Sequence, residues 1–483
     1  MTASPIRIVY IAAHGGYHPE RQPLGGGAAV CRRLVHLWAA DRKISLTLLA
    51  PGRRPPDTPV GVEYVHLPVL GDDDHPARLS RREYARFCRR FETAATDHLR
   101  GMTARPQAEP FVVLSNDISE GVDFRAVTAM GHPIVTIFHV DVADFFSRMY
   151  LRLNASPALP IAVYRAIASS GLSALCPDVL RLVFEKQSRC VRHSSRLVVP
   201  SAGMARTLGR CYGPRALRKT TVLPWGGWEE DVAEREVEGE MASARRDYDL
   251  RPDTPVLLTL SRISPEKGLD RLLKALLLWE RGASVPGLED VRVLICGGAA
   301  FMGGEAYAAG LRKTAARLRR IHVRFPGHVG GTRKRALFRL ADLYVSPARH
   351  ENYGLTIVEA LRQGVPVVSS VNSGSRHLVQ PAYGKEVDLQ GRDGEKRLLE
   401  ILQEMLSDRG ALASMGAAAR RAGRKMDFST GATALRDLLA NMTMEEAIAH
   451  FTQHDVVAAP VNTIPLAEAD PHPWERRAMV DVP

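Results

Sequence analysis

The stretch Leu343–Leu361, LYVSPARHENYGLTIVEAL, contains a strand, a loop and the start of a helix. Leu343–Ser346 is the short apolar run of a buried strand, and the pattern from Leu355 onward is helical. Between them, Gly354 allows backbone conformations that other residues avoid. A strand that leads through a turn into a helix is the repeating unit of α/β folds. This stretch therefore predicts an α/β protein with parallel strands.

The same alternation recurs along the chain in two groups. Strand-like runs in the first half are Ile6–Ala12, Ser45–Ala50, Phe111–Ser115 and Ile134–His139, and those in the second half are Pro255–Leu260, Arg292–Cys296, His322–Phe325, Leu343–Ser346 and Val365–Ser369. A chain of 483 residues exceeds one ordinary domain. The turn Pro224–Gly227, PWGG, suits a hinge. We predict a first domain of residues 1–223, a second of residues 224–441, and a proline-broken tail of residues 442–483.

The composition fits a folded protein with anionic ligands. Hydrophobic residues make up 45% and charged residues 24% of the chain. The net charge of +12 suits phosphates, an acidic membrane surface or nucleic acid, but no nucleic-acid module is recognisable. The six cysteines form no C-x-x-C pair, so we expect them to be reduced in a cytoplasmic protein. We expect neither a signal peptide nor a membrane-spanning helix.

A second informative stretch is Leu260–Gly268, LSRISPEKG, where a buried strand ends and Ser264 begins a helix. Lys267 lies at the helix N-terminus, where the macrodipole is already positive, so an anion is expected nearby. Arg262 emerges from the carboxyl end of the strand, the edge of an open α/β sheet where ligands bind. The two cations could clamp a diphosphate. The alternative is a solvated Lys267 paired with Glu266, and the local sequence leaves both open.

The loop and helix after the strand Leu343–Ser346 predict an anion seat. The N–H groups of Gly354, Leu355 and Thr356 point toward a ligand at a helix N-terminus. Glu351 and Glu359 are eight residues apart, so they can reach different parts of one ligand. We expect ribose hydroxyls to satisfy Glu359, because a partly buried carboxylate needs hydrogen-bond donors. The alternative is an ordinary amphipathic helix with two solvated acids.

Together, SRISPEKG at Ser261–Gly268 and HENYGLTIVEALRQGVPVVSS at His350–Ser370 resemble the signature pair of the family 4 retaining glycosyltransferases. Further segments match in the family's order, so the resemblance covers roughly residues 6–442. These segments are Leu197–Ser201, Leu223–Gly226, Ile295–Gly298 and Phe325–Gly327. The resemblance implies a GT-B fold, in which two Rossmann-like domains with parallel sheets face a central cleft. The acceptor then binds mostly to the first domain and the sugar nucleotide mostly to the second.

In the second domain, the resemblance implies that Arg262 and Lys267 bind the donor diphosphate. It places Glu351 at the hydroxyls of the transferred sugar and Glu359 at the ribose. The helix N-terminus described above then holds a donor phosphate. The implied co-substrate is a nucleotide-diphosphate sugar, without a further cofactor and without a metal ion.

In the first domain, Gly26 and Gly27 match the family's glycine pair, whose main chain approaches the donor phosphate and the acceptor. His139 matches the family's active-site histidine near the sugar, although a histidine after a strand is often structural. The implied reaction retains the anomeric configuration. Its usual account is a front-face displacement in which the leaving diphosphate helps to deprotonate the acceptor, so no protein nucleophile is needed.

Three segments depart from the pattern or from the fold. Pro224–Gly226 replaces the usual Pro-Asn-Gly turn, and Ser373–Ser375 stands where a Gly-Gly pair is common. In the tail, Val456–Thr463 and Ala469–His472 resemble a short C-terminal piece of the family III CoA-transferases. This piece lacks the rest of such an enzyme, so no CoA chemistry is inferred.

Other interpretations stay open at this point. The chain could be a sugar-nucleotide or glycan-binding protein without turnover, a CoA-dependent enzyme, or an epimerase or phosphorylase of the same fold. The acceptor could be a carbohydrate, a lipid-linked sugar or a small molecule. Arginines of one helical segment could form a peripheral membrane contact or an ordinary solvated face; they are Arg78, Arg81, Arg82, Arg86, Arg89 and Arg90. The acidic run Asp72–Asp74 is expected to be a surface loop rather than a metal site.

Overall fold

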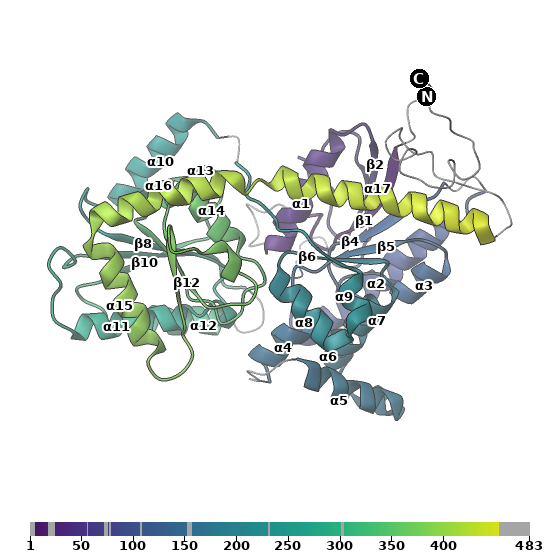
Figure 1. Ribbon diagram of the computed structural model, residues 1–483, viewed down its shortest axis with the longest axis horizontal. Helices are drawn as coiled ribbons and strands as arrows, with labels where there is room; N and C mark the ends of the chain where they lie inside the picture. Colours follow the sequence, from purple (N-terminus) through teal and green to yellow (C-terminus); the bar gives the residue numbers. More distant parts are fainter. Residues whose placement is uncertain are drawn as a thin grey trace, which may run out of the picture.

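The computed structural model describes residues 5–17, 25–55, 57–71, 76, 79–106, 109–151, 157–229, 232–300 and 304–453. These residues form two α/β domains, each built on a parallel sheet with helices on both faces (Figure 1). The predicted α/β class with parallel strands is confirmed. Residues 72–75, Arg78 and the tail segment 454–483 with its CoA-transferase-like stretches lie outside the described residues.

The first domain has a parallel sheet with the strand order β3-β2-β1-β4-β5-β6-β7. Its described strands are β1 Ile6–Ile11, β2 Ile44–Ala50, β3 Glu63–His66, β4 Val112–Ser115, β5 Ile134–Ile137, β6 Arg196–Val199 and β7 Thr220–Val222. The central strands are almost entirely Val, Ile and Leu and are buried on both faces, as parallel sheets require. The strand order reverses between β1 and β4. Ligands bind such sheets outside the carboxyl ends of the strands at this reversal.

Helices cover both faces of the first sheet. They are α1 Gly26–Ala39, α2 Arg81–Thr103, α3 Phe124–Ala129, α4 Val142–Met149, α5 Ala158–Ser169, η2 Leu172–Leu175, α6 Asp178–Leu180, the π-helical turn η3 Arg181–Glu185, α7 Lys186–His193, α8 Ala202–Tyr212 and α9 Pro214–Arg218. The longest of them, α2, begins in a capping box between Ser80 and Glu83. Its apolar stripe, which includes Phe87 and Phe91, is buried in the core.

The second domain repeats this design with the strand order β10-β9-β8-β11-β12-β13. Its strands are β8 Val256–Leu260, β9 Arg292–Cys296, β10 His322–Gly327, β11 Leu343–Ser346, β12 Val367–Ser370 and β13 Gly384–Val387. Its helices are α10 Glu234–Asp247, η4 Pro265–Lys267, α11 Leu269–Arg281, α12 Gly304–Ala315, α13 Gly331–Leu340, α14 Leu355–Gln363, η5 Arg376–Leu378, α15 Gly394–Ser407 and α16 Arg409–Lys425. Here the order reverses between β8 and β11.

The last described helix, α17 Phe428–Gln453, returns to the first domain and lies across it next to α1 (Figure 1). Arg436 of α17 forms an ion pair with Asp41 at 3.1 Å. The first part of this helix, up to residue 441, falls within the predicted second domain of residues 224–441. The apolar face of α17, which includes Leu435 and Leu439, instead packs on β1 and β4.

The chain passes between the domains twice, near Gly227 and near Asp427, and these two segments contact each other. Gly227 bridges to Asp427 in parallel register, and a Cβ at Gly226 would lie 2.2 Å from the carbonyl carbon of Asp427. Trp225 is 1% exposed, and its ring stacks on Phe428 at 5.8 Å. The departure from the family's Pro-Asn-Gly turn therefore places a large ring in the core at the junction of the domains.

Candidate active site

The segment Gly25–Gly27, which contains the predicted glycine pair, meets the predicted donor residues between the two domains. A Cβ at Gly25 would lie 3.7 Å from Nη1 of Arg262, and a Cβ at Gly26 would lie 3.0 Å from Cδ1 of Leu355. Arg262 follows β8 and Leu355 begins α14, which follows β11. The contacts therefore form at the reversal of strand order in the second sheet, where its crevice opens.

Lys267 and Glu351 form the central ion pair of the site. Nζ of Lys267 lies 2.8 Å from Oε2 of Glu351, and both side chains are largely buried. Burial acts to raise the pKa of Glu351, but the neighbouring ammonium of Lys267 outweighs it and holds that pKa below its usual value. Glu351 is therefore an ionised carboxylate. The anion expected near Lys267 is supplied by the protein itself.

The alternative in which Lys267 pairs with Glu266 is wrong. Glu266 instead lies 3.5 Å from Nη2 of Arg262, and it also accepts a hydrogen bond from the Ser264 hydroxyl. The carboxylate of Glu266 thus orients Arg262, whereas Lys267 turns to the loop that carries Glu351.

Arg349 ties these two loops together. Its guanidinium forms two hydrogen bonds to the carboxylate of Asp270, at 2.7 and 2.6 Å, and a third to the carbonyl of Pro265 at 2.8 Å. The bidentate geometry fixes direction as well as distance. Consequently, the loop before Glu351 and the turn that carries Lys267 are held in one arrangement.

The predicted anion seat is the N-terminus of α14. Gly354 has a φ of 102°, a left-handed conformation that a residue with a Cβ rarely adopts. No side chain among the described residues caps this helix. The Tyr344 hydroxyl contacts Oγ1 of Thr356 at 2.7 Å and the carbonyl of Leu260 at 3.0 Å, which ties α14 to the end of β8.

Glu359, predicted to bind a ribose, already has a partner. Nζ of Lys334 from α13 donates to its Oε1 at 3.0 Å, and both side chains are about one-fifth exposed. The sequence analysis did not identify Lys334, because nothing in its own neighbourhood points to α14. Glu359 therefore lies one helical turn farther along α14 than the seat, in an ion pair of its own.

On the first-domain side, Gly27 packs directly against His139. A Cβ at Gly27 would lie 2.8 Å from Cδ2 of His139, so only glycine fits here without a shift. Nε2 of His139 lies 3.1 Å from Oδ1 of Asn116. Burial lowers the pKa of His139 to about 3, so the imidazole is uncharged at neutral pH.

The carboxyl ends of β1 and β4 carry a buried polar cluster that the sequence analysis missed. It contains His14, Asn116, Asp117 and Glu120. The imidazole of His14 lies 3.7 Å from the carboxylate of Glu120, and Asn116 donates to Asp117 at 2.9 Å. Burial and the charge of Glu120 raise the pKa of Asp117 to about 7. The available signal was polar residues directly after the predicted strand Phe111–Ser115.

Further contacts close the cleft between the domains. The Ser201 hydroxyl donates to the carbonyl of Asn352 at 3.0 Å, and Nδ1 of His350 lies 3.6 Å from Oδ2 of Asp144. Gly374, within the departing Ser-Gly-Ser segment, packs on this loop, since a Cβ there would lie 2.2 Å from the carbonyl oxygen of Glu351. The loop that carries Glu351 is thus held from both domains.

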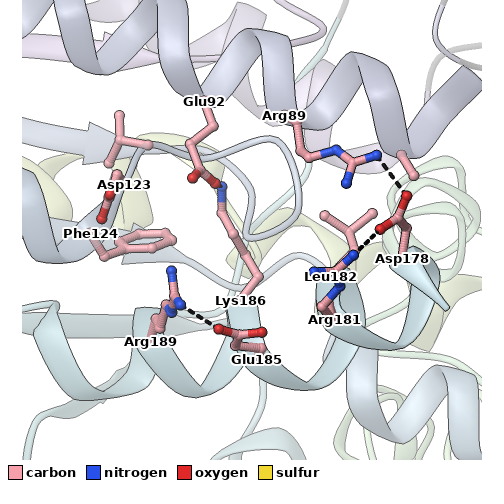
Figure 2. Close-up of a pocket in the computed structure, with 12 residues that line it drawn as sticks. Arg89, Glu92, Asp123, Phe124, Asp178, Arg181, Leu182, Glu185, Lys186 and Arg189 are labelled. Atoms are coloured by element: carbon pink, nitrogen blue, oxygen red, sulfur yellow. Dashed lines mark hydrogen bonds and ion pairs between the residues drawn. The ribbon is translucent and has the colours of Figure 1, made fainter. Parts of the chain in front are cut away.

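A separate pocket of about 230 Å³ lies within the first domain, between α2 and the η3–α7 segment (Figure 2). Figure 2 shows Arg89 and Arg181 directed at Asp178, and Arg189 directed at Glu185. Four basic and four acidic side chains line this pocket, so its charges balance. Arg89, one of the arginines considered for a membrane contact, is therefore paired with an acid.

The described residues contain no group of three or more His, Cys, Asp or Glu side chains that could hold a metal ion. Among these residues there is also no helix that is both long and apolar enough to cross a membrane.

Residues 241–422 match the sequence model of the family described as "Glycosyl transferases group 1". The chain is 30% identical to a D-inositol 3-phosphate glycosyltransferase of Xylanimonas cellulosilytica over 54% of its own length and 60% of the relative's. It is 31% identical to a GDP-mannose-dependent monoacylated alpha-(1-6)-phosphatidylinositol monomannoside mannosyltransferase of Corynebacterium glutamicum, over 38% of its own length and 45% of the relative's. The chain thus spans about half the length of these curated relatives.

Solved structures resemble the whole two-domain arrangement. Sucrose-phosphate synthase from Thermosynechococcus elongatus superimposes with a TM-score of 0.66 at 17% identity, covering 91% of this chain and 100% of that one. The Anabaena HepE protein in complex with UDP and glucose gives a TM-score of 0.60 at 16% identity, with the same coverage. The predicted GT-B fold is therefore confirmed. The match to the group 1 model lies in the second half of the chain.

Proposed function

We propose that this protein is a retaining glycosyltransferase that moves a sugar from a nucleotide-diphosphate donor to an acceptor. The observation that carries the proposal is the convergence of Arg262, Lys267, Glu351 and the N-terminus of α14 at one edge of the second sheet, opposite Gly26 and Gly27. Two cations and a helix N-terminus are what a diphosphate requires. The group 1 match over residues 241–422 supports the same conclusion.

In this proposal, the donor diphosphate lies against the N-terminus of α14, and Arg262 and Lys267 stabilise the charge that develops as it leaves. Such fixed donors and charges need no reorganisation during the reaction, which makes them effective in catalysis. Glu351, held ionised by Lys267, accepts hydrogen bonds from hydroxyls of the transferred sugar. Glu359 and Lys334 lie where the ribose end of the donor is proposed to bind.

The acceptor side of the reaction is assigned to the first domain. His139 is uncharged and therefore contributes hydrogen bonding and shape rather than charge. We propose that the leaving diphosphate itself assists deprotonation of the acceptor, so that neither a protein nucleophile nor a metal ion takes part. The names of the two relatives contain inositol 3-phosphate and phosphatidylinositol monomannoside, which favours a polyol or lipid-linked acceptor here. A cytoplasmic location stays a prediction.

The test is release of the nucleoside diphosphate from UDP-, GDP-, ADP- and TDP-sugars, followed with and without candidate acceptors. Wild-type protein should turn over one donor class, and Glu351→Gln should lower that rate at least about a hundredfold. Glu305→Gln, at an exposed position in α12, is the matched control and should behave as wild type. Donor binding without turnover under any condition would contradict the proposal and indicate a binding protein of the same fold.

A further inference from the structure

Large exposed apolar side chains gather on one segment of the first domain. We call this surface the apolar face; it consists of Tyr150 and Leu151 after α4, Leu159 and Val163 on α5, and Leu172 and Leu175 on η2. Leu159 is 66% exposed and Leu175 is 81% exposed, and α5 and η2 contact each other. Single exposed apolar residues are ordinary, but a cluster of this kind on a soluble protein marks an interaction surface.

Helix α5 is apolar on both of its sides. Ile161 and Tyr164 point inward and are buried with Phe184 in a small core cluster. Leu159 and Val163, four residues apart, lie on the outward side, where a surface helix normally carries polar residues. We expect a helix with this pattern to bury its outward side chains against a binding partner. Figure 1 shows α5 at the edge of the first domain opposite to α17.

The charge of this segment indicates which kind of partner binds the apolar face. From Phe145 to Pro177 the sequence contains three arginines and no Asp or Glu. Arg165 on α5 is exposed, and its guanidinium lies 5.0 Å from the ring centre of Tyr212. Apolar side chains combined with arginines and without acids suit the interface of an anionic lipid bilayer.

Aromatic ring contacts lead from the apolar face to the loop that carries Glu351. The ring of Tyr150 lies 6.3 Å from that of Phe145, which in turn meets His350 edge-to-face at 5.7 Å. His350 directly precedes Glu351. A short series of aromatic contacts therefore links the exposed surface to the proposed catalytic loop.

We infer that the apolar face docks on an anionic lipid surface and thereby presents the cleft to an acceptor carried by the membrane. The docking itself follows from the exposed residues and the charge of the segment. The assignment of a membrane-borne acceptor rests in addition on the proposed transferase function. The outward side chains of α5 and η2 enter the headgroup region, while the exposed Arg165 meets the lipid phosphates.

Docking is tested by sedimentation of the full chain with vesicles of phosphatidylcholine alone, and of phosphatidylcholine mixed with phosphatidylglycerol. Wild-type protein should bind the mixed vesicles more strongly than the neutral ones. Leu159→Glu combined with Leu175→Glu should weaken binding to mixed vesicles at least about tenfold, because it removes two inserted side chains and adds negative charge. The matched control is Val60→Glu combined with Leu278→Glu, which changes two exposed apolar residues elsewhere and should bind as wild type.

Three outcomes would overturn the inference: no binding of wild type to either vesicle, equal binding of both double variants, or a self-association of wild type that Leu159→Glu and Leu175→Glu abolish without any lipid binding. The last would assign the surface to a second copy of the chain. A thermal unfolding curve for each variant checks that the fold is intact. Because sedimentation needs neither a donor nor turnover, failure of docking and failure of the transferase proposal are distinguishable.

Discussion

The facing edges of the two sheets differ in the charge state of their polar side chains. At the edge of the second sheet, charges stand in explicit pairs, Lys267 with Glu351 and Arg349 with Asp270. At the edge of the first sheet, His139 is buried and uncharged and Asp117 is shifted toward its neutral form. The second edge is thus prepared for an anion. The first also holds the contact between His14 and Glu120 at 3.7 Å, and in the proposed function it receives a neutral partner such as an acceptor hydroxyl.

The largest expected effect is that of Lys267→Ala. Removing the ammonium takes a cation from the proposed diphosphate site and leaves the largely buried carboxylate of Glu351 without it. We expect at least about a hundredfold loss of turnover and a loss of about 2 kcal/mol of stability. Rates of donor cleavage and urea unfolding measure the two effects. The control is Lys313→Ala on the exposed side of α12; equal rates in both variants would remove Lys267 from the site.

A smaller effect is expected from Gly27→Ala, which tests the contact between the glycine turn and the first-domain edge. The added methyl group would meet the His139 ring at 2.8 Å, so the ring or the turn must move, at a cost of about 1–3 kcal/mol. We expect turnover to fall about tenfold with the displacement of these groups. Gly239→Ala in α10, where nothing lies within 4 Å, should instead be neutral or stabilising. The measurements are thermal unfolding and kcat of both variants. Equal values for Gly27→Ala and Gly239→Ala would show that the contact with His139 is unimportant.

Much of the proposed donor site could be predicted from the sequence alone. Arg262, Lys267, Glu351 and Gly354 were identified because each lies in a short stretch where a strand ends and a helix begins. Their relative placement then follows from the sheet, since β8 and β11 are neighbours at the reversal of strand order. The fold class was also predictable from the sequence, because buried parallel strands are continuous runs of Val, Ile and Leu.

The rest could not be predicted, because it depends on contacts between distant parts of the chain. The cluster around Asp117 joins residues that follow β1 to residues that follow β4, and no local spacing pairs them. Lys334 reaches Glu359 from a different helix. The short strands β3 and β13 have weak apolar patterns, and only the two end residues of β13 are buried. The return of α17 to the first domain leaves no local signal.

A pH series sharpens the contrast between the two edges. The pKa of Asp117 is raised from 3.8 to about 7, so the folded protein holds a proton that the unfolded chain has already released. The stability from this group is fully present below about pH 4 and is lost as the pH rises toward 7. Asp117→Asn cannot titrate, so its melting temperature relative to wild type should rise between pH 5 and pH 8. The same series for Asp253→Asn, an exposed position, should show no such trend; parallel curves for Asp117→Asn and wild type would refute the assignment.

The smallest effect is expected from Ser201→Ala, which removes the hydrogen bond from α8 to the loop that carries Glu351. Ser201 also caps α8 by accepting from the Met204 amide at 3.3 Å, so the loss combines a cap with a link between domains. We expect a loss of about 1–2 kcal/mol in urea unfolding and a raised KM for the donor. Ser80→Ala removes the cap of α2 alone and should leave KM unchanged. A normal KM in Ser201→Ala would show that this contact does not close the cleft.

The most direct test of the account is a thermal-shift comparison of wild type and Arg262→Ala with UDP, GDP, ADP, TDP, their sugar conjugates and CoA. We predict that one nucleoside diphosphate and its conjugates raise the melting temperature of wild type and that this shift disappears in Arg262→Ala. Arg312→Ala, at an exposed position in α12, should keep the full shift. No shift with any nucleotide, a shift with CoA alone, or an equal shift in Arg262→Ala would contradict a donor site at the edge of the second sheet.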